Sequence, residues 1–470
     1  MTGPEVVVVG AGPVGLLLAG ELRLRGIEVL LADRLAAPMT ESRASQLNAR
    51  TVELLDERDL LGRFAGIEHV DRGHYAGLPV EVSGTDSAHD GLWKFPQYET
   101  ESALREWVAE LGVDFRREYE LRGLTDAGDH VETEFATPKG TVHVPADYVV
   151  GCDGADSAVR RLAGIEFVGA DPTRELLRAD VTGIDVRDRR FERLEHGLAV
   201  AATRAGVTRV MVHQFGGPVP VRDAAPPFDE VVRTWAKLTG EDIGAGTAVW
   251  VDSFDNTRKQ AAEYRRGRVL LAGDAAHVHM PIGGHALNLG LQDAFNLGWK
   301  LAAQIRGWAP ENLLDSYHDE RHAVGAAVLD DVAAQELLLL GGPEVDAMRA
   351  VLSELLELPD ARANIVATAS GLDVRYGPDG ARMPRIELDG GSTTQLLRSG
   401  RGLLLDLSGD EGLREAAAGW ADRVDLVAAR PAEDAAGQAF LVRPDGYVAW
   451  RSTSDEPLPV SLRRWFGVPR

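Results

Sequence analysis

The sequence of 470 residues contains one cysteine, and five of its 50 basic residues are lysine. A single thiol, Cys152, cannot form an intramolecular disulfide or a thiolate metal cluster, so the fold depends on neither. No apolar run reaches the ~20 residues needed to span a bilayer. The N-terminal segment contains Glu5 and lacks a basic stretch before its apolar run, unlike a signal peptide. We therefore expect a protein of the reducing cytoplasm.

Positive charge is also scarce. The chain has 73 acidic residues against 50 basic ones, a formal net charge of −23. Nucleic acid and anionic membranes would be repelled unless basic residues clustered locally, and no such cluster occurs along the sequence. The remaining composition, 44% hydrophobic and 26% charged, is typical of a globular protein. The length predicts roughly two or three domains.

The first 33 residues have the pattern of a dinucleotide-binding unit. A strand, a helix and a second strand are expected at 5–9, 13–25 and 29–32. Gly10, Gly12 and Gly15 form a Gly-x-Gly-x-x-Gly turn, where a pyrophosphate approaches bare backbone at a helix N-terminus. Asp33 ends the second strand about twenty residues later, where an acid holds a ribose hydroxyl.

Two later strands also end in acidic and glycine residues. VPADYVVGCDGADSAVRR predicts a strand followed by Asp153, Gly154 and a helix that carries Arg160. GRVLLAGDAAH predicts a strand that ends at Gly273 and Asp274. Ligands of open parallel sheets bind beyond the carboxyl ends of the strands. We therefore expect three distant strand ends to meet around one ligand.

A proline and two glycines, Pro281, Gly283 and Gly284, directly precede a long amphipathic run. We expect a helix to begin near Leu287. Bare backbone followed by a helix N-terminus suits an electron-rich group, because unpaired N–H groups and the helix dipole both favour negative charge.

The remaining pattern predicts inserted sheets and a separate tail. Alternating stretches within 75–129 and 180–253 predict antiparallel strands, and glycine and proline cluster near 375–385. The tail alternates strands with a short helix and holds a Pro-Asp-Gly hairpin turn. The expected domains are a discontinuous nucleotide-binding domain at 1–75, 97–180 and 254–330, a sheet domain at 76–96 and 181–253, a helical connection at 331–378 and a tail domain at 379–470.

The motifs resemble those of the single-component FAD-dependent aromatic hydroxylases of the para-hydroxybenzoate hydroxylase type. The resemblance rests on GAGPVG, GCDGADSAVRR and LAGDAAHVHMPIGGHALNLGLQDAFNLGWKLA, in this order over almost the whole chain. It is strongest to hydroxylases of aromatic polyketides such as angucyclines and anthracyclines, with the rifampicin monooxygenases nearby. The implied fold is α/β: a Rossmann-like FAD-binding domain of the glutathione reductase type, an inserted antiparallel β-sheet substrate domain and a C-terminal thioredoxin-like domain.

The resemblance also implies cofactors and site residues. FAD is the expected cofactor, with NADPH or NADH as a transient reductant. The residues expected to line the flavin ring where oxygen reacts are Pro281, Gly283, Gly284 and His285. Those expected to hold FAD are Gly10, Gly12, Gly15, Asp33, Arg34, Arg43, Gln97, Asp153, Gly154, Arg160, Asp274, Pro281, Gly284, Ala286, Leu287 and Asn288. Those expected in a substrate pocket of the inserted strands are His74, Tyr75, Trp93 and His213.

The implied reaction is hydroxylation of a polycyclic aromatic polyketide or a similar phenol with O2, through a flavin C4a-hydroperoxide protected from water. Two alternatives stay open. The same oxygenated flavin would serve Baeyer–Villiger oxidation or epoxidation. A flavin-binding protein without oxygenase activity is the other alternative.

That last alternative arises from the loop after Gly283. The family usually has Gly-Gly-Gln-Gly followed by an apolar residue and asparagine, whereas this chain has Gly284, His285, Ala286, Leu287 and Asn288. If the replaced glycine has positive φ in relatives, an alanine there would cost about 1 kcal/mol. His285 is expected either to face solvent at the helix entry or to touch flavin or substrate.

No metal site is expected. His277 and His279 lie on a loop with Asp274 and without a further ligand at suitable spacing. The residues His318, Glu320 and His322 do not match the His-Glu-x-x-His pattern, and we interpret them as a solvated helix face.

Dithiol chemistry is not expected either. Cys152 is interpreted as a small buried residue. The tail domain lacks Cys-x-x-Cys, which excludes dithiol–disulfide exchange and leaves a structural or dimer-contact role. A homodimer is therefore the expected assembly.

Overall fold

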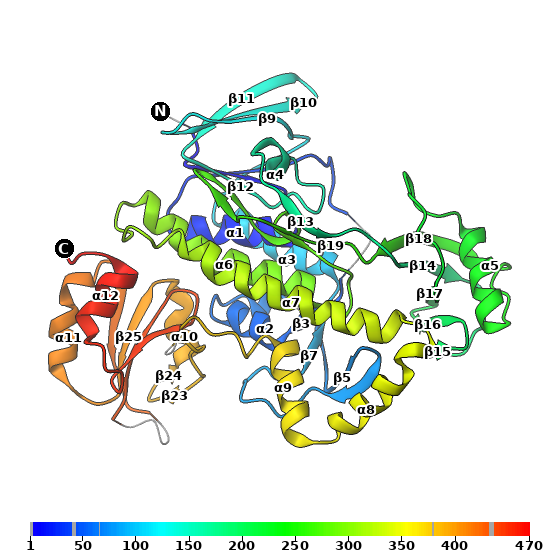
Figure 1. Cartoon of the computed structure of the whole chain (residues 1–470). Coiled ribbons are helices and arrows are strands. Elements are labelled where there is room, and N and C mark those ends of the chain that lie inside the picture. Colours follow the sequence, from blue (N-terminus) through cyan, green and yellow to red (C-terminus); the bar gives the residue numbers. More distant parts are fainter. Residues whose placement is uncertain (1–2, 40–43, 65, 378–379, 432–436) are drawn as a thin grey trace.

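The computed structural model describes residues 3–39, 44–64, 66–377, 380–431 and 437–470. A six-stranded sheet of order β20-β21-β12-β1-β2-β8 forms its centre (Figure 1). These strands are β1 (Val6–Val9), β2 (Val29–Asp33), β8 (Asp114–Arg117), β12 (Tyr148–Gly151), β20 (Arg265–Arg266) and β21 (Val269–Leu271). All neighbours are parallel except the edge pair β20 and β21. The strands β1, β12 and β21 are fully buried, as in parallel sheets covered on both faces.

The predicted strand–helix–strand unit is confirmed to within one residue at each boundary. Helix α1 (Pro13–Leu24) joins β1 to β2 and has a proline in its first turn, where a missing N–H costs nothing. The three predicted strand ends are those of β1, β12 and β21, which are neighbours in the sheet. Their carboxyl ends therefore open at one edge, as expected.

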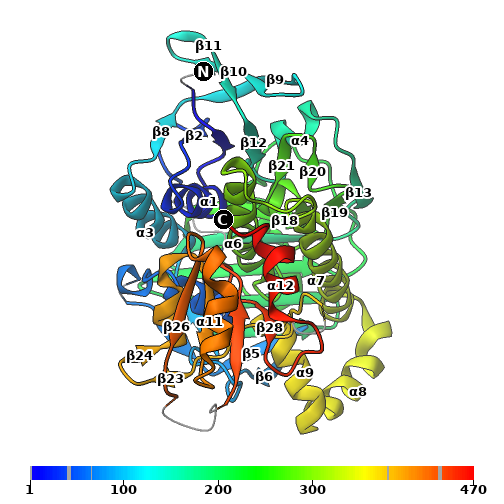
Figure 2. The same cartoon turned by 90° about the vertical axis from the view of Figure 1, so that its left-hand side faces the viewer.

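Three helices pack side by side under the sheet: α1, α3 (Gln97–Glu110) and α6 (His285–Ile305) (Figures 1 and 2). The strand expectation for 75–129 is wrong for α3. Its apolar residues recur at helical spacing, and Trp107 packs so close to Gly20 that a Cβ there would lie 2.0 Å from the ring.

Two glycines bring α6 against α1. A Cβ on Gly290 would lie 2.7 Å from a methyl of Val14, and a Cβ on Gly298 would lie 2.7 Å from Cβ of Glu21. Any larger side chain would push these helices apart, so the absence of side chains at these positions sets their close approach.

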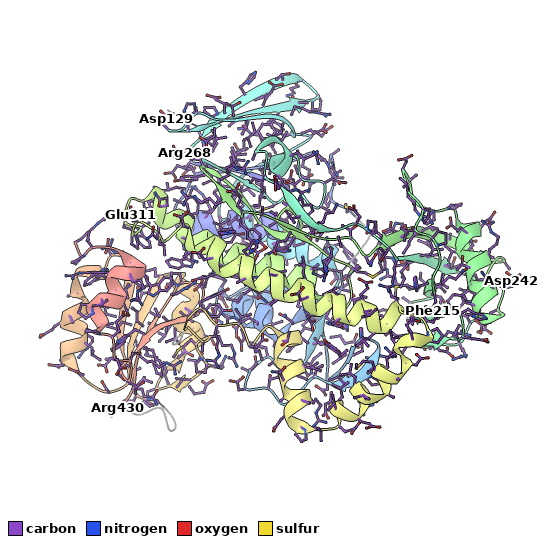
Figure 3. The ribbon with its side chains drawn as sticks, in the orientation of Figure 1. Asp129, Phe215, Asp242, Arg268, Glu311 and Arg430 are labelled. Atoms are coloured by element: carbon purple, nitrogen blue, oxygen red, sulfur yellow. The ribbon has the colours of Figure 1, made fainter. Side chains whose placement is uncertain are left out.

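Small elements complete this central part. The meander of β9 (Glu120–Asp126), β10 (Val131–Thr137) and β11 (Gly140–Ala146) lies at the top of Figure 1, and Asp129 marks its turn in Figure 3. Further elements are β3 (Gln46–Asn48), α2 (Ala49–Asp56), β4 (Glu68–Val70), β5 (Arg72–Tyr75), β6 (Leu78–Glu81), β7 (Leu92–Lys94), α4 (Ala158–Leu162), β13 (Phe167–Ala170), β19 (Arg258–Ala261) and β22 (His277–Val278). β5 and β6 form a hairpin, and β7 pairs with β3 and β4 rather than with the larger inserted sheet.

The inserted sheet is antiparallel and has the order β15-β16-β17-β14-β18. Its strands are β14 (Glu175–Thr182), β15 (Arg189–Leu194), β16 (Gly197–Arg204), β17 (Val207–Gln214) and β18 (Thr247–Asp255). Helix α5 (Phe228–Thr239) covers one face and buries Trp235 against it. Figure 3 shows Phe215 and Asp242 in this part, at the far end of the molecule from Arg430.

Three helices lead to the C-terminal domain: α7 (Ser316–Leu340), α8 (Asp346–Leu356) and α9 (Pro359–Ser370). This domain holds a sheet of order β26-β25-β27-β28, made of β25 (Gly402–Asp406), β26 (Val424–Ala428), β27 (Ala439–Val442) and β28 (Val448–Arg451). Its other elements are β23 (Glu387–Leu388), β24 (Gly391–Ser392), α10 (Thr393–Leu396), α11 (Glu411–Ala417) and α12 (Leu458–Phe466). The predicted Pro-Asp-Gly turn joins β27 to β28, with Gly446 at φ 77°.

That turn anchors the C-terminal domain to α6 and α7. Arg443 donates to both carboxylate oxygens of Glu320 at 2.6 and 2.9 Å, and Lys300 donates to Glu320 at 2.7 Å. Burial would raise the pKa of Glu320, but Arg443 and Lys300 outweigh it and lower the pKa to about 2. Glu320 is therefore an ionised partner inside the joint, and its interpretation as part of a solvated face is wrong.

Within the described ranges, no helix is long and apolar enough to cross a membrane.

Candidate active site

The turn after β1 is closed on its inner side and open on its outer side. A Cβ on Gly10, whose φ is 101°, would lie 2.4 Å from the carbonyl oxygen of Cys152, and one on Gly15 would lie 1.9 Å from that of Gly10. A Cβ on Gly12 would meet no atom within 4 Å. Gly12 precedes α1 and makes no side-chain cap, so the helix N-terminus faces this open space.

Asp33 steadies this turn. Its carboxylate accepts hydrogen bonds from the backbone N–H of Ala11 at 2.7 Å and of Leu35 at 2.8 Å. It lies at the end of β2, beside the open side of the turn, where each of its oxygens can accept a further hydrogen bond. Cys152 packs behind the turn, and burial raises the pKa of its thiol, as expected of an inert residue.

The end of β12 is built around Asp153. Its carboxylate accepts from the Ser157 hydroxyl at 2.5 Å and from the backbone N–H groups of Ala158 and Val159 at 2.6 and 3.1 Å. It therefore caps the short helix α4. Gly154, with φ 84°, would carry a Cβ into open space.

Arg160 joins the ends of β12 and β21. Its guanidinium donates to the carbonyl oxygens of Ala275 at 2.8 Å and Ala155 at 2.6 Å, and it stacks over Phe167 at 3.7 Å. Asp153 and Arg160 thus hold the backbone of the strand ends in place through contacts inside the protein.

A buried ion cluster that the sequence analysis missed supports the end of β21. The carboxylate of Asp293, on α6, accepts from the Gly273 N–H at 3.1 Å, from His277 at 2.7 Å and from Arg321 at 2.7 Å. Asp293, His277 and Arg321 are almost fully buried. The sequence signal was an acid within the apolar run LNLGLQDAFNLGW, which a helix interior tolerates only when the charge is paired. Asp274, next to Gly273, is exposed at the strand end.

The histidines near this strand end are held by the protein. His277 belongs to the Asp293 cluster, and His279 Nδ1 lies 2.8 Å from the Met280 carbonyl oxygen. Burial lowers the pKa of His279 to about 3. No group of three or more histidine, cysteine or acidic side chains among the described residues has the geometry of a metal site.

The glycine loop leads directly into α6. Gly283 and Gly284 have φ of 74° and 75°, and the helix begins at His285, two residues before the expected start. Ala286 lies in the first helical turn with ordinary helical backbone, so the expected strain at this position is absent. Gly284 makes no side-chain cap, which leaves the first N–H groups of α6 available to a ligand.

His285 points inward, so the solvent-facing interpretation is wrong. Its Nε2 lies 3.6 Å from the Asp331 carboxylate and 3.4 Å from the Gln335 side chain, both on α7. Burial lowers its pKa, which leaves the ring neutral at pH 7. Asp331 also accepts a hydrogen bond from the Tyr75 hydroxyl at 2.8 Å.

A cavity of about 640 Å³ reaches the glycine loop at Gly283. Its walls come from β5, β7, the start of β3 and β15, so it lies between the central part and the inserted sheet. Residues around it include His74, Phe191, Gln46, Lys94 and Arg190. The rings of His74 and Phe191 are 4.1 Å apart between centroids. Tyr75 lines a small adjoining space that also touches Gly283 and His285.

The other two expected substrate residues lie elsewhere. Trp93 packs against His69 and donates to the His89 carbonyl oxygen at 3.0 Å. His213 is buried, with its ring nitrogens 2.7 Å from the Glu175 and 3.2 Å from the Leu340 carbonyl oxygens. Neither lines the cavity: Trp93 faces the opposite side of β7 from Lys94, and His213 lies on β17, which contributes no residue to the cavity lining.

The remaining expected cofactor residues differ in their exposure. Gln97 is the first residue of α3 and donates to Glu101 at 3.0 Å, and Arg34 is exposed after β2. Asn288 binds the backbone of β3 through Asn48 N–H at 2.9 Å and Gln46 C=O at 3.1 Å. Pro281 is exposed and Leu287 is half-buried. Arg43 lies outside the described residues.

These features fit a dinucleotide with a charged ring system. The open sides of Gly12 and Gly154 leave room for a pyrophosphate at a helix N-terminus. The uncapped start of α6 suits the anionic side of a reduced flavin, and the cavity at Gly283 leaves room for a second molecule beside it.

Comparisons with known proteins agree with this geometry. Residues 4–332 match the family described as FAD binding domain, and residues 377–469 match that described as aromatic-ring hydroxylase, C-terminal. The chain is 39% identical to 12-dehydrotetracycline 5-monooxygenase/anhydrotetracycline 6-monooxygenase of Streptomyces rimosus subsp. rimosus, over 99% of each chain. It is also 39% identical to a rifampicin monooxygenase of Streptomyces venezuelae, again over 99% of each chain.

A solved structure is similar throughout. The crystal structure of CabE, an aromatic hydroxylase from angucycline biosynthesis, matches with a TM-score of 0.96 and 45% identity, over 100% of both chains. A dialkyldecalin synthase of Streptomyces rugosporus is 38% identical over 98% of each chain. The resemblance seen in the sequence is thereby confirmed: the chain belongs to the FAD-binding aromatic-ring hydroxylase family of flavoprotein monooxygenases.

Proposed function

We propose that this protein uses NADPH or NADH and O2 to hydroxylate a polycyclic aromatic polyketide or a similar phenol. The observation that carries the proposal is the cavity of about 640 Å³ at Gly283, beside the uncapped start of α6. Its volume lies within the roughly 300–1,000 Å³ of small-molecule sites. The names of the tetracycline, rifampicin and angucycline relatives support a polycyclic substrate.

Residues at different positions have different roles in binding FAD. Gly10, Gly12 and Gly15 shape the turn for the FAD pyrophosphate, with Asp33 on the ribose. Asp274, Gln97, Arg34, Arg43 and Asn288 make further contacts with FAD. When bound, FAD supplies electron transfer from NAD(P)H and the reaction with O2.

The start of α6 stabilises negative charge. The first N–H groups of the helix, at Ala286 and Leu287, and its dipole favour an anionic ring next to Gly284 by roughly 0.3–2 kcal/mol. Pro281 and Gly283 bound the place where oxygen reacts. The inserted sheet and the β5–β6 hairpin keep water away from it.

The proposal includes the domain limits, the fold of the C-terminal domain, the location and the assembly. The domain limits are the residue ranges that the sequence pattern predicts. The C-terminal sheet of order β26-β25-β27-β28 with α11 and α12 beside it supports a thioredoxin-like fold without thiol chemistry. A cytoplasmic location and a homodimer complete the proposal.

The test is NAD(P)H oxidation by FAD-loaded protein with a panel of polycyclic phenols. We expect stimulated oxidation and a product one oxygen atom heavier, with NMR placing a new hydroxyl on an aromatic ring. A new ester in the product would instead indicate Baeyer–Villiger oxidation, and a new epoxide would indicate epoxidation. Purified, folded protein that takes up no FAD would overturn the proposal.

A second candidate is a flavin-binding protein without oxygenase activity. The 38% identity to a dialkyldecalin synthase favours this candidate, because that relative is similar over 98% of its length and is named as a synthase rather than as a monooxygenase. Oxygen transfer separates the two: FAD-loaded protein whose reduced flavin is reoxidised by O2 to give only H2O2, with no oxygen atom found in any substrate, would establish this candidate.

A further inference from the structure

The cavity at Gly283 brings together cationic side chains from three separate segments. Arg72 comes from β5, Lys94 from β7 and Arg190 from β15. Asp71 is the acidic residue among those lining the cavity, and it lies 3.5 Å from His69. The lining therefore carries an excess of positive charge within a chain of net charge −23.

Among the described residues, no carboxylate lies within ion-pairing distance of these cations. Glu68, the cross-strand neighbour of Lys94, partly offsets the lowering of its pKa, but its carboxylate lies 3.5 Å from Arg204. Lys94 donates a short hydrogen bond to the side-chain oxygen of Gln46. Arg190 donates to the backbone carbonyls of Arg72 at 3.4 Å and Gly73 at 3.3 Å. Burial and the charge of Arg190 lower the pKa of Lys94. Gathering like charges and desolvating one of them costs free energy unless an anion joins them.

The position of Lys94 relates this charge to the reacting loop. Its partner Gln46 also lies 3.4 Å from the Gly283 carbonyl oxygen, so Lys94 and the loop share one side chain. An anionic group held by Lys94 and Arg190 would keep the attached ring system inside the cavity, beside Gly283. His74, on the same wall, is half-buried, its pKa is lowered to about 4, and its ring lies next to that of Phe191.

We propose that the substrate binds as an anion, with a ring oxyanion or carboxylate held by Lys94 and Arg190 beside the glycine loop. The inference rests on the proposed function and deepens it by naming the charge state that the site selects. An ionised phenol is the more electron-rich form of an aromatic ring, which suits attack by an electrophilic oxygen. Lys94 and Arg190 are thus residues that determine substrate specificity and orientation.

The test is calorimetric binding of two matched ligand pairs to the FAD-loaded protein. Anthraquinone-2-carboxylate is compared with its carboxamide, and 1,2-dihydroxyanthraquinone, at a pH where it is ionised, with its dimethyl ether. The first pair tests a carboxylate and the second a phenolate. The variants are Lys94→Met and Arg190→Met, with Lys139→Met, an exposed lysine between β10 and β11, as the control.

We expect at least one anionic ligand to bind about 10-fold or more tightly than its neutral partner, as a charged hydrogen bond predicts. That ratio should fall towards one in Lys94→Met and Arg190→Met, and stay unchanged in Lys139→Met. Unchanged affinity for the neutral ligands shows that the cavity of each variant is intact.

Equal affinity within both pairs, or a preference that survives in both cavity variants, overturns the inference. If only the inference is wrong, the protein still takes up FAD and hydroxylates neutral substrates. If the proposed function is wrong, the protein takes up no FAD or transfers no oxygen to any substrate.

Discussion

The C-terminal joint and the cavity at Gly283 both gather cationic side chains, but they partner them differently. At the joint, Arg443 and Lys300 reach the carboxylate of Glu320 at 2.6–2.9 Å. At the cavity, Lys94 and Arg190 reach neutral amide and carbonyl oxygens. A paired charge fixes how two parts pack, whereas a half-buried cation such as Lys94, without a carboxylate in ion-pairing distance, is poised for a ligand. The comparison predicts opposite consequences for stability when a charge is removed.

The largest effect is expected at the joint. Glu320→Ala leaves Lys300 buried without its carboxylate and Arg443 with Asp445 alone, and it should lower the free energy of unfolding by about 3–5 kcal/mol. Denaturant titration measures this loss. The control is Asp315→Ala, which removes the exposed partner of Arg265 and should cost roughly 0–1 kcal/mol. Equal losses in the two variants would remove the distinction between the joint and the surface.

A pH effect is expected from His74. Burial, then the charges of Arg190 and Lys94, lower its pKa from the ordinary 6.5 to about 4. The unfolded chain therefore binds more protons between these values, so the free energy of unfolding falls as pH drops from 6.5 to 4. The contribution is about 3 kcal/mol.

Thermal or denaturant unfolding across this pH range measures the effect. His74→Gln should flatten the pH dependence, whereas His196→Gln, at an exposed histidine, should leave it unchanged. Because burial also lowers the pKa of His279 and His285, the difference between variant and parent isolates His74. Identical slopes in His74→Gln and the parent would contradict the prediction.

The cofactor turn offers an intermediate effect. Gly12→Ala adds a methyl group where the protein itself leaves 4 Å of open space, with φ −72° that alanine accepts. We expect unfolding of the apoprotein to be nearly unchanged and FAD affinity to fall by about 10-fold or more, because the methyl occupies the pyrophosphate position. Flavin titration measures the FAD affinity. The control is Gly62→Ala, because a Cβ on Gly62 would also meet no atom within 4 Å. Full FAD affinity in Gly12→Ala would place the pyrophosphate elsewhere.

The smallest effect is expected at the cavity. Lys94→Met removes a desolvated cation that faces Arg190 and should leave the free energy of unfolding unchanged or raise it by up to about 1 kcal/mol. Chemical unfolding without ligand tests the sign. A clear loss of stability would mean that Lys94 is a structural residue like Lys300.

Local patterns in the sequence predicted the central parallel strands and the turns that follow them. The β1–α1–β2 unit and the adjacent ends of β1, β12 and β21 follow from strand and helix periodicity and from glycines whose constraints are local. The start of α6 was misplaced by two residues, because Gly284 rather than the apolar pattern ends the loop.

Charges that meet across the fold were beyond the sequence pattern. Asp293 pairs with Arg321, 28 positions away, and Glu320 pairs with Arg443, 123 positions away. The spacing of His318, Glu320 and His322 gave no sign that the face between them is covered by another domain. Lys94 and Arg190 likewise form a basic cluster only after the inserted sheet folds over β7.

Helix α6 gives the C-terminal domain an influence on chemistry that it does not touch. The helix is 21 residues long, or about 31 Å, and begins directly after the glycine loop at Gly284. Farther along it, Gly290 and Gly298 hold it against α1, and Lys300 and Asn296 bind the Glu320 joint. A helix that is packed at several points along its length moves as one unit, so a tilt at one end also displaces the other end. Under the proposed function, loosening the distant joint would shift the dipole at the start of α6, so the C-terminal domain would influence the electron affinity of a flavin that it does not touch.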